Sequence, residues 1–370
     1  MIKLFEVENF KNFDRKFSLD FTDVRDYKFN KQCIDKGLLN KIIIYGKNSV
    51  GKTNFGLALF DITTHLVDKN FDAQAYRNYI NFNTGCDYAT FNYVFDFDGV
   101  EINYKYSKKS SKEVIAEKLF IDGTKIYSYN ELQGEKDFSG LGYINAESLN
   151  WEFVDDSISI LRYIANNTSL DQNSPIKKMI TFVSNMLCFR SLEAAKYIGF
   201  ENGNGGILEY IIKNDLVDEF QQFLLDSKVK QKIAVRPENT GEKVVYFQSN
   251  DGKRYIPFAQ AVSSGTWALT IFFYWYKNFS KISFLFIDEF DAFYHFELSE
   301  KIVKLIEQFQ GFQTILTSHN TNLLSNKIMR PDCYFILTKE KIVSLVNSTK
   351  RELREGHNLE KLFMSGEFDE

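Results

Sequence analysis

The clearest chemistry in this sequence lies in nine consecutive residues that could hold a chain of phosphates. They are Gly46, Lys47, Asn48, Ser49, Val50, Gly51, Lys52, Thr53 and Asn54. The first eight match G-x-x-x-x-G-K-[ST] without a mismatch, a pattern typical of a phosphate-binding loop. The two glycines let the backbone turn tightly, so that its N–H groups point at phosphate oxygens. We expect Lys52 to reach the β- and γ-phosphates and Thr53 to hold Mg²⁺. The sequence therefore predicts a nucleotide and Mg²⁺ as ligands.

A second group, far along the chain, could supply a metal ligand and a base. Residues 284–287 are apolar, and Asp288 and Glu289 follow them directly. A buried strand that ends in this acidic pair places both carboxylates at the edge of a sheet. We expect Asp288 to bind the magnesium ion, directly or through water, and Glu289 to take a proton from attacking water. The alternative is a core strand that ends in a solvated acidic turn.

Two polar turns add further candidates. His319 follows a predicted buried strand, residues 313–318, and lies at the tip of that strand, where ligands of α/β sheets bind. There it could donate a hydrogen bond to a γ-phosphate, although a lone histidine is more often structural. Ser263, Gly265 and Thr266 lie in a small turn before the apolar segment 267–276. This turn predicts a helix N-terminus, which attracts anions, and a structural N-cap is the alternative.

These residues need a sheet and helices to position them. Residues 2–21 predict two strands, residues 42–45 a buried strand, residues 55–67 a helix and residues 90–129 an antiparallel meander. Helical spacing recurs at 158–166, 176–187, 192–197 and 207–225, and strands return at 232–235, 243–248 and 254–258. The predicted fold is α/β, with a mixed sheet, an antiparallel β lobe and an inserted helical lobe. We divide it at 1–149, 150–230 and 231–370.

The bulk properties narrow the class of protein. The 370 residues carry 45 Lys and Arg against 49 Asp and Glu, so nothing attracts the whole chain to nucleic acid or to anionic membranes. The four cysteines are far apart in sequence, which argues against a zinc site or a disulfide framework and fits a reducing compartment. The first residues have no signal-peptide pattern, and the longest apolar segment is too short to span a bilayer. We expect a cytoplasmic protein with no membrane partner.

Taken in order, these motifs resemble those of ABC-type ATPases. The turn at Ser263–Thr266 is similar to the S-x-G-T form of their signature motif, and residues 284–289 are similar to their Walker B strand. Glu8-Asn9-Phe10-Lys11 resembles the opening of RecF-, SMC- and OLD-like ATPases. The chain also resembles AAA15/AAA21-type ATPases of bacterial phage-defence and abortive-infection systems, such as RloA-like proteins and the ATPase subunit of PARIS-type pairs.

The resemblance implies two copies of the chain that face head to tail around ATP. Lys52, Thr53, Asp288, Glu289 and His319 would act on ATP in their own subunit, with Lys52, Glu289 and His319 as the catalytic residues. Lys11 would add a contact to the nucleotide. Ser263, Gly265 and Thr266 would contact the ATP of the partner subunit. The family's Q-loop glutamine has no clear counterpart, although Gln74 and Gln133 are available.

Three functions follow from this pattern. The leading hypothesis is a slow ATPase switch that controls a separate effector, such as a nuclease, in anti-phage defence. The alternative is a RecF-like DNA-binding repair ATPase, which leaves nucleic acid open as a partner, although the mild acidity of the chain counts against it. A non-catalytic assembly partner is the third, and Glu289 argues against that role. The turn at Ser263–Thr266 lacks the L-S-G-G-Q sequence of transporter ATPases.

Overall fold

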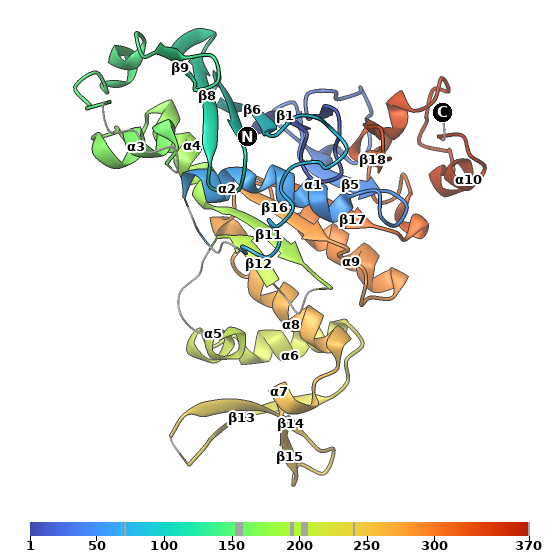
Figure 1. Cartoon of the computed structure of the whole chain (residues 1–370). Helices are drawn as coiled ribbons and strands as arrows, with labels where there is room; N and C mark the ends of the chain where they lie inside the picture. Colours follow the sequence, from blue (N-terminus) through green and yellow to red (C-terminus); the bar gives the residue numbers. More distant parts are fainter. Residues whose placement is uncertain are drawn as a thin grey trace.

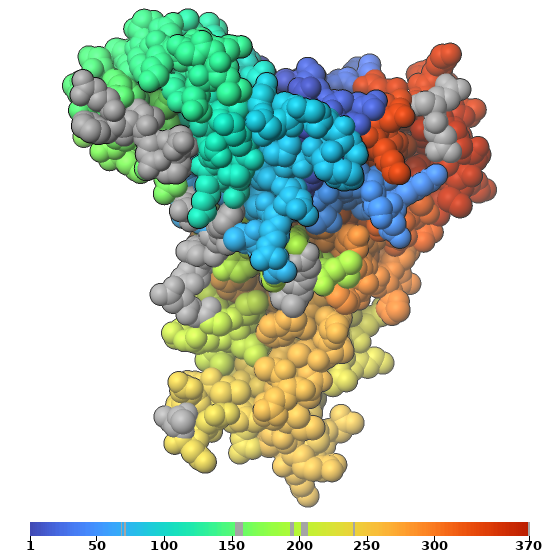
Figure 2. All heavy atoms as spheres, viewed as in Figure 1, coloured from blue at the N-terminus to red at the C-terminus, as the bar shows by residue number. Residues whose placement is uncertain are grey.

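Two seven-stranded sheets, with the helix of the phosphate loop between them, form the body of the molecule (Figure 1). The computed structural model describes residues 1–67, 69, 72–151, 158–192, 196–200, 206–239 and 241–368. Figure 2 shows that the molecule is elongated, with the antiparallel lobe at one end and residues of the 230–260 region at the other. In the described ranges, no helix combines the length and apolar character that crossing a bilayer requires.

The first sheet is antiparallel throughout and runs in the order β10-β9-β8-β7-β6-β1-β2. Its strands are β1 (Ile2–Glu8), β2 (Phe17–Asp20), β6 (Ala89–Phe97), β7 (Val100–Lys108), β8 (Val114–Ile121), β9 (Thr124–Asn130) and β10 (Glu135–Asp137). Both central residues of the turn between β6 and β7, Asp98 and Gly99, have positive φ. A hairpin turn of this kind matches the twist of the strands, so the predicted meander is confirmed.

The second sheet is mixed and runs in the order β12-β11-β16-β17-β5-β18-β19. Its strands are β5 (Lys41–Tyr45), β11 (Met186–Arg190), β12 (Lys196–Gly199), β16 (Phe284–Asp288), β17 (Gln313–Ser318), β18 (Tyr334–Leu337) and β19 (Ile342–Ser344). The five central strands are parallel and the two edge strands are antiparallel. All residues of β5, β16 and β17 are buried, as expected of strands covered on both faces.

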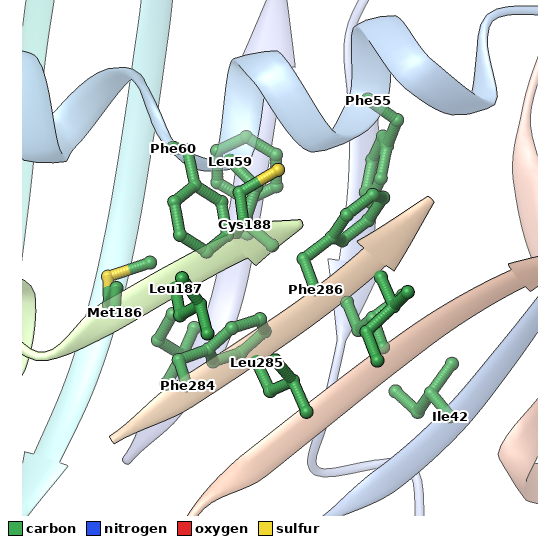
Figure 3. Packing of buried hydrophobic residues seen from close by; sticks show 14 of the residues in the cluster. Ile42, Phe55, Leu59, Phe60, Met186, Leu187, Cys188, Phe284, Leu285 and Phe286 are labelled. Atoms are coloured by element: carbon green, nitrogen blue, oxygen red, sulfur yellow. The ribbon is translucent and has the colours of Figure 1, made fainter. Parts of the chain in front are cut away.

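Helix α1 (Lys52–Leu59) packs against both sheets. A Cβ atom on Gly56 would lie 2.4 Å from the ring of Phe286 in β16, so only glycine allows this approach. On the other side, the rings of Phe55 and Phe5 are 5.6 Å apart. Figure 3 shows Phe55 of this helix above Phe286. Packing against the two sheets fixes the position of helix α1 and therefore of the loop that precedes it.

The remaining elements form the lobes around this body. They are the β-hairpin β3 (Ile34–Asp35) and β4 (Leu38–Leu39), the helices α2 (Asp61–Leu66), α3 (Ile160–Asn167), α4 (Pro175–Ser184), α5 (Ile207–Lys213), α6 (Val217–Asp226), α7 (Phe258–Ala261), α8 (Ser264–Tyr276), α9 (Phe296–Glu307) and α10 (Leu359–Met364), and a three-stranded sheet of β13 (Lys232–Pro237), β14 (Lys243–Gln248) and β15 (Tyr255–Pro257). This sheet and α5 to α7 form the narrow end of the molecule (Figure 1).

The predicted α/β class, with a mixed sheet and an antiparallel β lobe, is confirmed. Two predicted helices are wrong in part. The helix predicted at 176–187 ends at Ser184, and the strand β11 follows it. The helix predicted at 192–197 falls partly outside the described residues, and its end belongs to β12. Short apolar runs fit either state, and here pairing with β16 decides for the strand.

Other boundaries are refined in smaller ways. The helix predicted from residue 55 begins at Lys52 and breaks at Phe60, after which α2 begins. The range 150–230 contains helices, as predicted, and it also gives β11 and β12 to the mixed sheet. The division of the chain at 149 and 230 stays a prediction.

Candidate nucleotide-binding site

The loop between β5 and α1 has the shape that its two glycines require. Gly51 has φ of 108°, and a Cβ atom there would lie 2.4 Å from the side chain of Asn12. A Cβ atom on Gly46 would lie 2.7 Å from the carbonyl oxygen of Leu337. Lys47, Asn48 and Ser49 are exposed at the crest, and Val50 is buried below them. Because both motif glycines occupy positions that exclude a side chain, the loop forms the cradle that a phosphate group needs.

Lys52 lies at the centre of this site. Its Nζ donates a 3.0 Å hydrogen bond to the carbonyl oxygen of Gly46 and lies 2.7 Å from Nε2 of His319. Burial lowers the pKa of Lys52, and the nearby carboxylates, led by Glu289 and followed by Asp288, act against this effect. The ammonium group is therefore held between the end of β5 and the end of β17.

Thr53 and Asp288 meet at the start of α1. Oγ1 of Thr53 donates a 2.6 Å hydrogen bond to one carboxylate oxygen of Asp288, and Oγ1 of Thr317 donates a 2.7 Å bond to the other. Asp288 is only 7% exposed. A hydroxyl and a carboxylate at this distance are the hard oxygen ligands that Mg²⁺ prefers, so the residues present fit the ion.

Glu289 and His319 face each other across the same site. Oε1 of Glu289 lies 3.5 Å from Nε2 of His319, the nitrogen that also faces Lys52. Glu289 has φ of 48°, and its N–H donates a 2.7 Å hydrogen bond to Oγ1 of Thr317. Because of this left-handed turn directly after β16, the side chains of Glu289 and Asp288 point in different directions. One carboxylate can thus serve a metal while the other serves a proton.

The turn that resembles a signature motif opens helix α8. Oγ of Ser263 accepts a 3.2 Å hydrogen bond from the N–H of Thr266, so the predicted N-cap is present. Gly265 lies beside the backbone of Phe293, whose carbonyl oxygen would be 3.3 Å from a Cβ atom on the glycine. In the described part of the chain, no hydrogen bond joins this turn to Lys52 or to Asp288.

Lys11, predicted to contact the nucleotide, lies in the turn after β1 and has φ of 51°. Its Nζ donates a 2.8 Å hydrogen bond to the carbonyl oxygen of Arg77. Burial lowers the pKa of Lys11, and the positive charge of Arg190 lowers it further. Its neighbour Asn12, which the sequence analysis missed, is the residue that contacts the loop. Its position next to the Asn9-Phe10-Lys11 motif was the available signal.

Arg190 is a second residue that the sequence did not reveal. It ends β11 and pairs in parallel register with Asp288, so it lies at the edge of the sheet where the acidic pair lies. Arg190 is 7% exposed, and its Nη1 lies 3.3 Å from Oδ2 of Asp72. Of the two glutamines considered for the Q-loop, Gln74 lies two residues after Asp72, and Gln133 lies in the exposed turn after β9. A prediction of β11 as a strand would have placed Arg190 at the site.

Asp291 and Ser318 close the far side of the site. Oγ of Ser318 donates a 2.7 Å hydrogen bond to Oδ2 of Asp291. Burial raises the pKa of Asp291, and this hydrogen bond opposes the shift. Because Ser318 precedes His319, the pair ties the turn after β16 to the tip of β17.

A protein-family model covers most of the chain, and several solved structures are similar to it. Residues 41–325 match the family described as "AAA domain, putative AbiEii toxin, Type IV TA system". A solved SMC head bound to the C-winged helix domain of ScpA is 15% identical, with 93% of this chain and 97% of that chain covered and a TM-score of 0.45. The SMC head domain from Thermotoga maritima is 14% identical, with 93% and 98% covered and a TM-score of 0.42.

The recombination mediator protein RecF is 13% identical, with 93% of this chain and 98% of that chain covered and a TM-score of 0.43. No curated protein matches the sequence.

Proposed function

Because the chain belongs to the AAA_21 family of AAA domains, we propose that it binds ATP with Mg²⁺ at residues 46–54 and hydrolyses it slowly. One observation carries this proposal. Lys52, Thr53, Asp288, Glu289 and His319 come from three separate parts of the chain and meet at one edge of the mixed sheet. Chemically matched residues gathered in this way are typical of phosphoryl transfer sites.

Each residue has a distinct role in this proposal. The loop N–H groups and Lys52 bind the phosphates, and Thr53 and Asp288 hold the metal. Mg²⁺, when bound, neutralises negative charge on the phosphates. Glu289 takes a proton from water as the water oxygen attacks the γ-phosphorus and the bond to ADP breaks. His319, between Lys52 and Glu289, orients Glu289 and contacts the γ-phosphate.

We further propose that two copies of the chain enclose ATP between them. In support, the turn at Ser263–Thr266 begins α8 at the surface and is not hydrogen-bonded to Lys52 or Asp288 of its own chain. Phe293, whose carbonyl oxygen lies beside Gly265, is 38% exposed and adds apolar surface next to this turn. Ser263, Gly265 and Thr266 would then contact the ATP that the partner subunit holds, as in ABC-type ATPases.

The biological role that we propose is control of a separate effector, such as a nuclease, in anti-phage defence. The family description, which names a toxin of a type IV toxin–antitoxin system, supports a role of this kind. We propose a cytoplasmic location, supported by the four free cysteines, three of them buried. A RecF-like repair ATPase is the second candidate, and the excess of Lys and Arg over Asp and Glu in residues 228–258, seven against three, favours it.

The test uses Glu289→Gln, which keeps the size of the side chain but removes the base. In Mg²⁺ and ATP, we expect this variant to bind ATP, to lose about 100-fold or more in turnover, and to elute at twice the 43.2 kDa mass of the chain. Light scattering after size-exclusion chromatography measures the mass. Glu340→Gln, an exposed glutamate, is the matched control and should behave as wild type.

A second variant separates the two parts of the proposal. Ser263→Arg added to Glu289→Gln should abolish the dimer and leave ATP binding intact, since Ser263 would act on the ATP of the partner subunit. A Glu289→Gln protein that binds ATP but stays monomeric contradicts the proposed dimer. Failure of the wild-type protein to bind ATP contradicts the nucleotide site itself.

A further inference from the structure

The three-stranded sheet at the narrow end of the molecule has one face packed and one face open. On the packed face, Phe247 of β14 lies 4.5 Å from Phe258 of α7, between ring centroids, and Val245 is 1% exposed. The register pairs Lys232 with Gln248, and Gln248 with Tyr255. Because side chains alternate along a strand, the opposite face carries another set of residues. We call it the outer face, and its polar and aromatic members are Lys232, Arg236, Tyr246, Gln248 and Tyr255.

The outer face lies in a basic part of an acidic chain. Residues 228–258 contain seven Lys and Arg against three Asp and Glu, whereas the whole chain has a net charge of -4. Lys232 and Arg236 on the face are exposed, as are Lys243, Lys253 and Arg254 at its borders. Among the residues that the structure describes, none of these five forms an ion pair within 4.0 Å. Their charge is therefore available to an anionic partner.

Aromatic side chains on this face are held in fixed positions. The guanidinium carbon of Arg236 lies 4.1 Å from the centre of the Tyr255 ring, and the rings of Tyr246 and Tyr255 are 6.5 Å apart and nearly perpendicular. The Tyr255 hydroxyl donates a 2.9 Å hydrogen bond to the carbonyl oxygen of Gly252 and accepts a 3.2 Å bond from Gln248. A planar cation stacked on a fixed ring presents a flat surface, on which a nucleobase can stack at little cost in conformational entropy.

We propose that the outer face binds single-stranded nucleic acid, with phosphates on Lys232 and Arg236 and bases on Tyr246 and on the Arg236–Tyr255 stack. The combination of exposed cations with aromatic rings favours this partner. An acidic protein would satisfy the charges but would leave the fixed rings without a role. Intact duplex would keep its bases stacked on one another and away from the rings.

The position of the face connects it to the nucleotide site. Strand β15 continues directly into α7, and Val262 alone separates α7 from Ser263 of the signature-like turn. A nucleic-acid strand bound to the outer face thus lies one short helix away from Ser263–Thr266. We propose that these residues contact the ATP of the partner subunit. This inference goes beyond the proposed ATPase function, because the binding it describes needs no ATP.

Fluorescence anisotropy of the full chain tests the proposal. The probes are labelled oligo-dT and oligo-U of about 20 nucleotides, which exceeds the site size of one small binding module. Lys232→Glu/Arg236→Glu should weaken binding about tenfold or more at about 50 mM salt. It should also lower the slope of log K against log salt by about 1.4, since each single-strand phosphate contact contributes about 0.7. Comparison of the two probes shows whether DNA or RNA is preferred.

Two further variants make the test specific. Lys105→Glu/Lys136→Glu changes the charge equally on the antiparallel lobe, where both lysines are exposed, and should change affinity less than about threefold. Tyr246→Ala should weaken oligonucleotide binding about fivefold or more but leave binding of inorganic polyphosphate unchanged, because polyphosphate has no bases. Thermal unfolding midpoints confirm that each variant is folded.

Three results would overturn the proposal. One is equal weakening by the two charge-reversal pairs. Another is equal loss of oligonucleotide and polyphosphate binding in Tyr246→Ala. The third is tighter binding of duplex than of single strands, which would assign the basic charge to a duplex or to another anionic partner.

Discussion

Asn12 donates a 2.9 Å hydrogen bond from Nδ2 to the carbonyl oxygen of Val50 and so fixes the phosphate loop from outside. The same amide accepts a 2.7 Å hydrogen bond from Nδ2 of Asn54, in the first turn of α1. Because Val50 precedes Gly51 and Asn54 follows it closely, Asn12 ties together both sides of the turn. The N-terminal turn after β1 is therefore part of the candidate site.

Asn12→Ala should weaken ATP binding by up to about 30-fold, because two hydrogen bonds worth about 1 kcal/mol each no longer hold the loop in its binding shape. Isothermal titration calorimetry with ATP and Mg²⁺ measures this change. Asn173→Ala removes an exposed amide on the surface and serves as the control. An ATP affinity of Asn12→Ala equal to that of the control would show that the loop keeps its shape without Asn12.

Thr53→Val should remove the dependence of ATP affinity on Mg²⁺, because the hydroxyl beside Asp288 is lost while the volume is kept. Wild-type protein should bind ATP more tightly in Mg²⁺ than in EDTA, and the variant should bind about equally in both. Thr53→Ser keeps the hydroxyl and should retain the Mg²⁺ effect. If Thr53→Val responds to Mg²⁺ as wild type does, the threonine is not a metal ligand.

His319→Ala should lower kcat about 10- to 100-fold with little change in KM, since the imidazole orients Glu289 and does not bind the whole nucleotide. Steady-state phosphate release measures both constants. His319→Gln restores one hydrogen-bonding group near Lys52 and should recover part of the rate. A rise in KM without loss of kcat would assign His319 to binding instead.

Glu307 should make folding stability depend on pH. Burial raises the pKa of this glutamate to about 7, while hydrogen bonds from Gln32 and Cys33 and the charges of Lys304 and Lys41 act in the opposite direction. The folded state therefore holds the proton more tightly than the unfolded state. The resulting stabilisation is fully present below pH 4.5, the ordinary pKa, and is lost as the pH rises through about 7.

Glu307→Gln removes this ionisation and keeps a similar side chain. The free energy of unfolding of the variant, relative to wild type, should rise by up to about 3 kcal/mol between pH 4.5 and 7 and stay level above that range. Urea unfolding at a series of pH values measures the difference. Glu340→Gln, at an exposed position, should show no such rise. A pH-independent difference for Glu307→Gln would contradict the elevated pKa.

Much of the site could be predicted because its chemistry is local in sequence. The spacing of Gly46, Gly51 and Lys52 requires only one turn. The apolar run before Asp288 is long enough to predict a buried strand, and residues 313–318 before His319 were predicted as another. Because parallel strands end at one edge of a sheet, it could be predicted that these residues lie close together. Contacts between side chains that are distant in sequence could not be predicted. Thr317, which bonds both Asp288 and the N–H of Glu289, lies in an unremarkable strand sequence.

The main error in the fold has a similar cause. Residues 186 and 187 continue the apolar spacing of α4, and nothing local marks the change from helix to strand at Asn185. The change depends on a ladder with β16, almost 100 residues later. Because the predicted helix ran into the first two residues of β11 and no strand was predicted there, Arg190 was not placed beside Asp288, and its contact with Asp72 could not be foreseen.

The order of strands in the mixed sheet also has a consequence for synthesis of the protein. Strand β5, which carries the phosphate loop, is flanked by β17 and β18, and both lie more than 260 residues further along the chain. The antiparallel hairpins of β6 to β9 need only nearby partners and can form early on the ribosome. The apolar strand β5 must wait, exposed, until most of the chain has been translated. The growing chain therefore gains its nucleotide site late, and chaperones that shield apolar segments should matter most for residues 41–45.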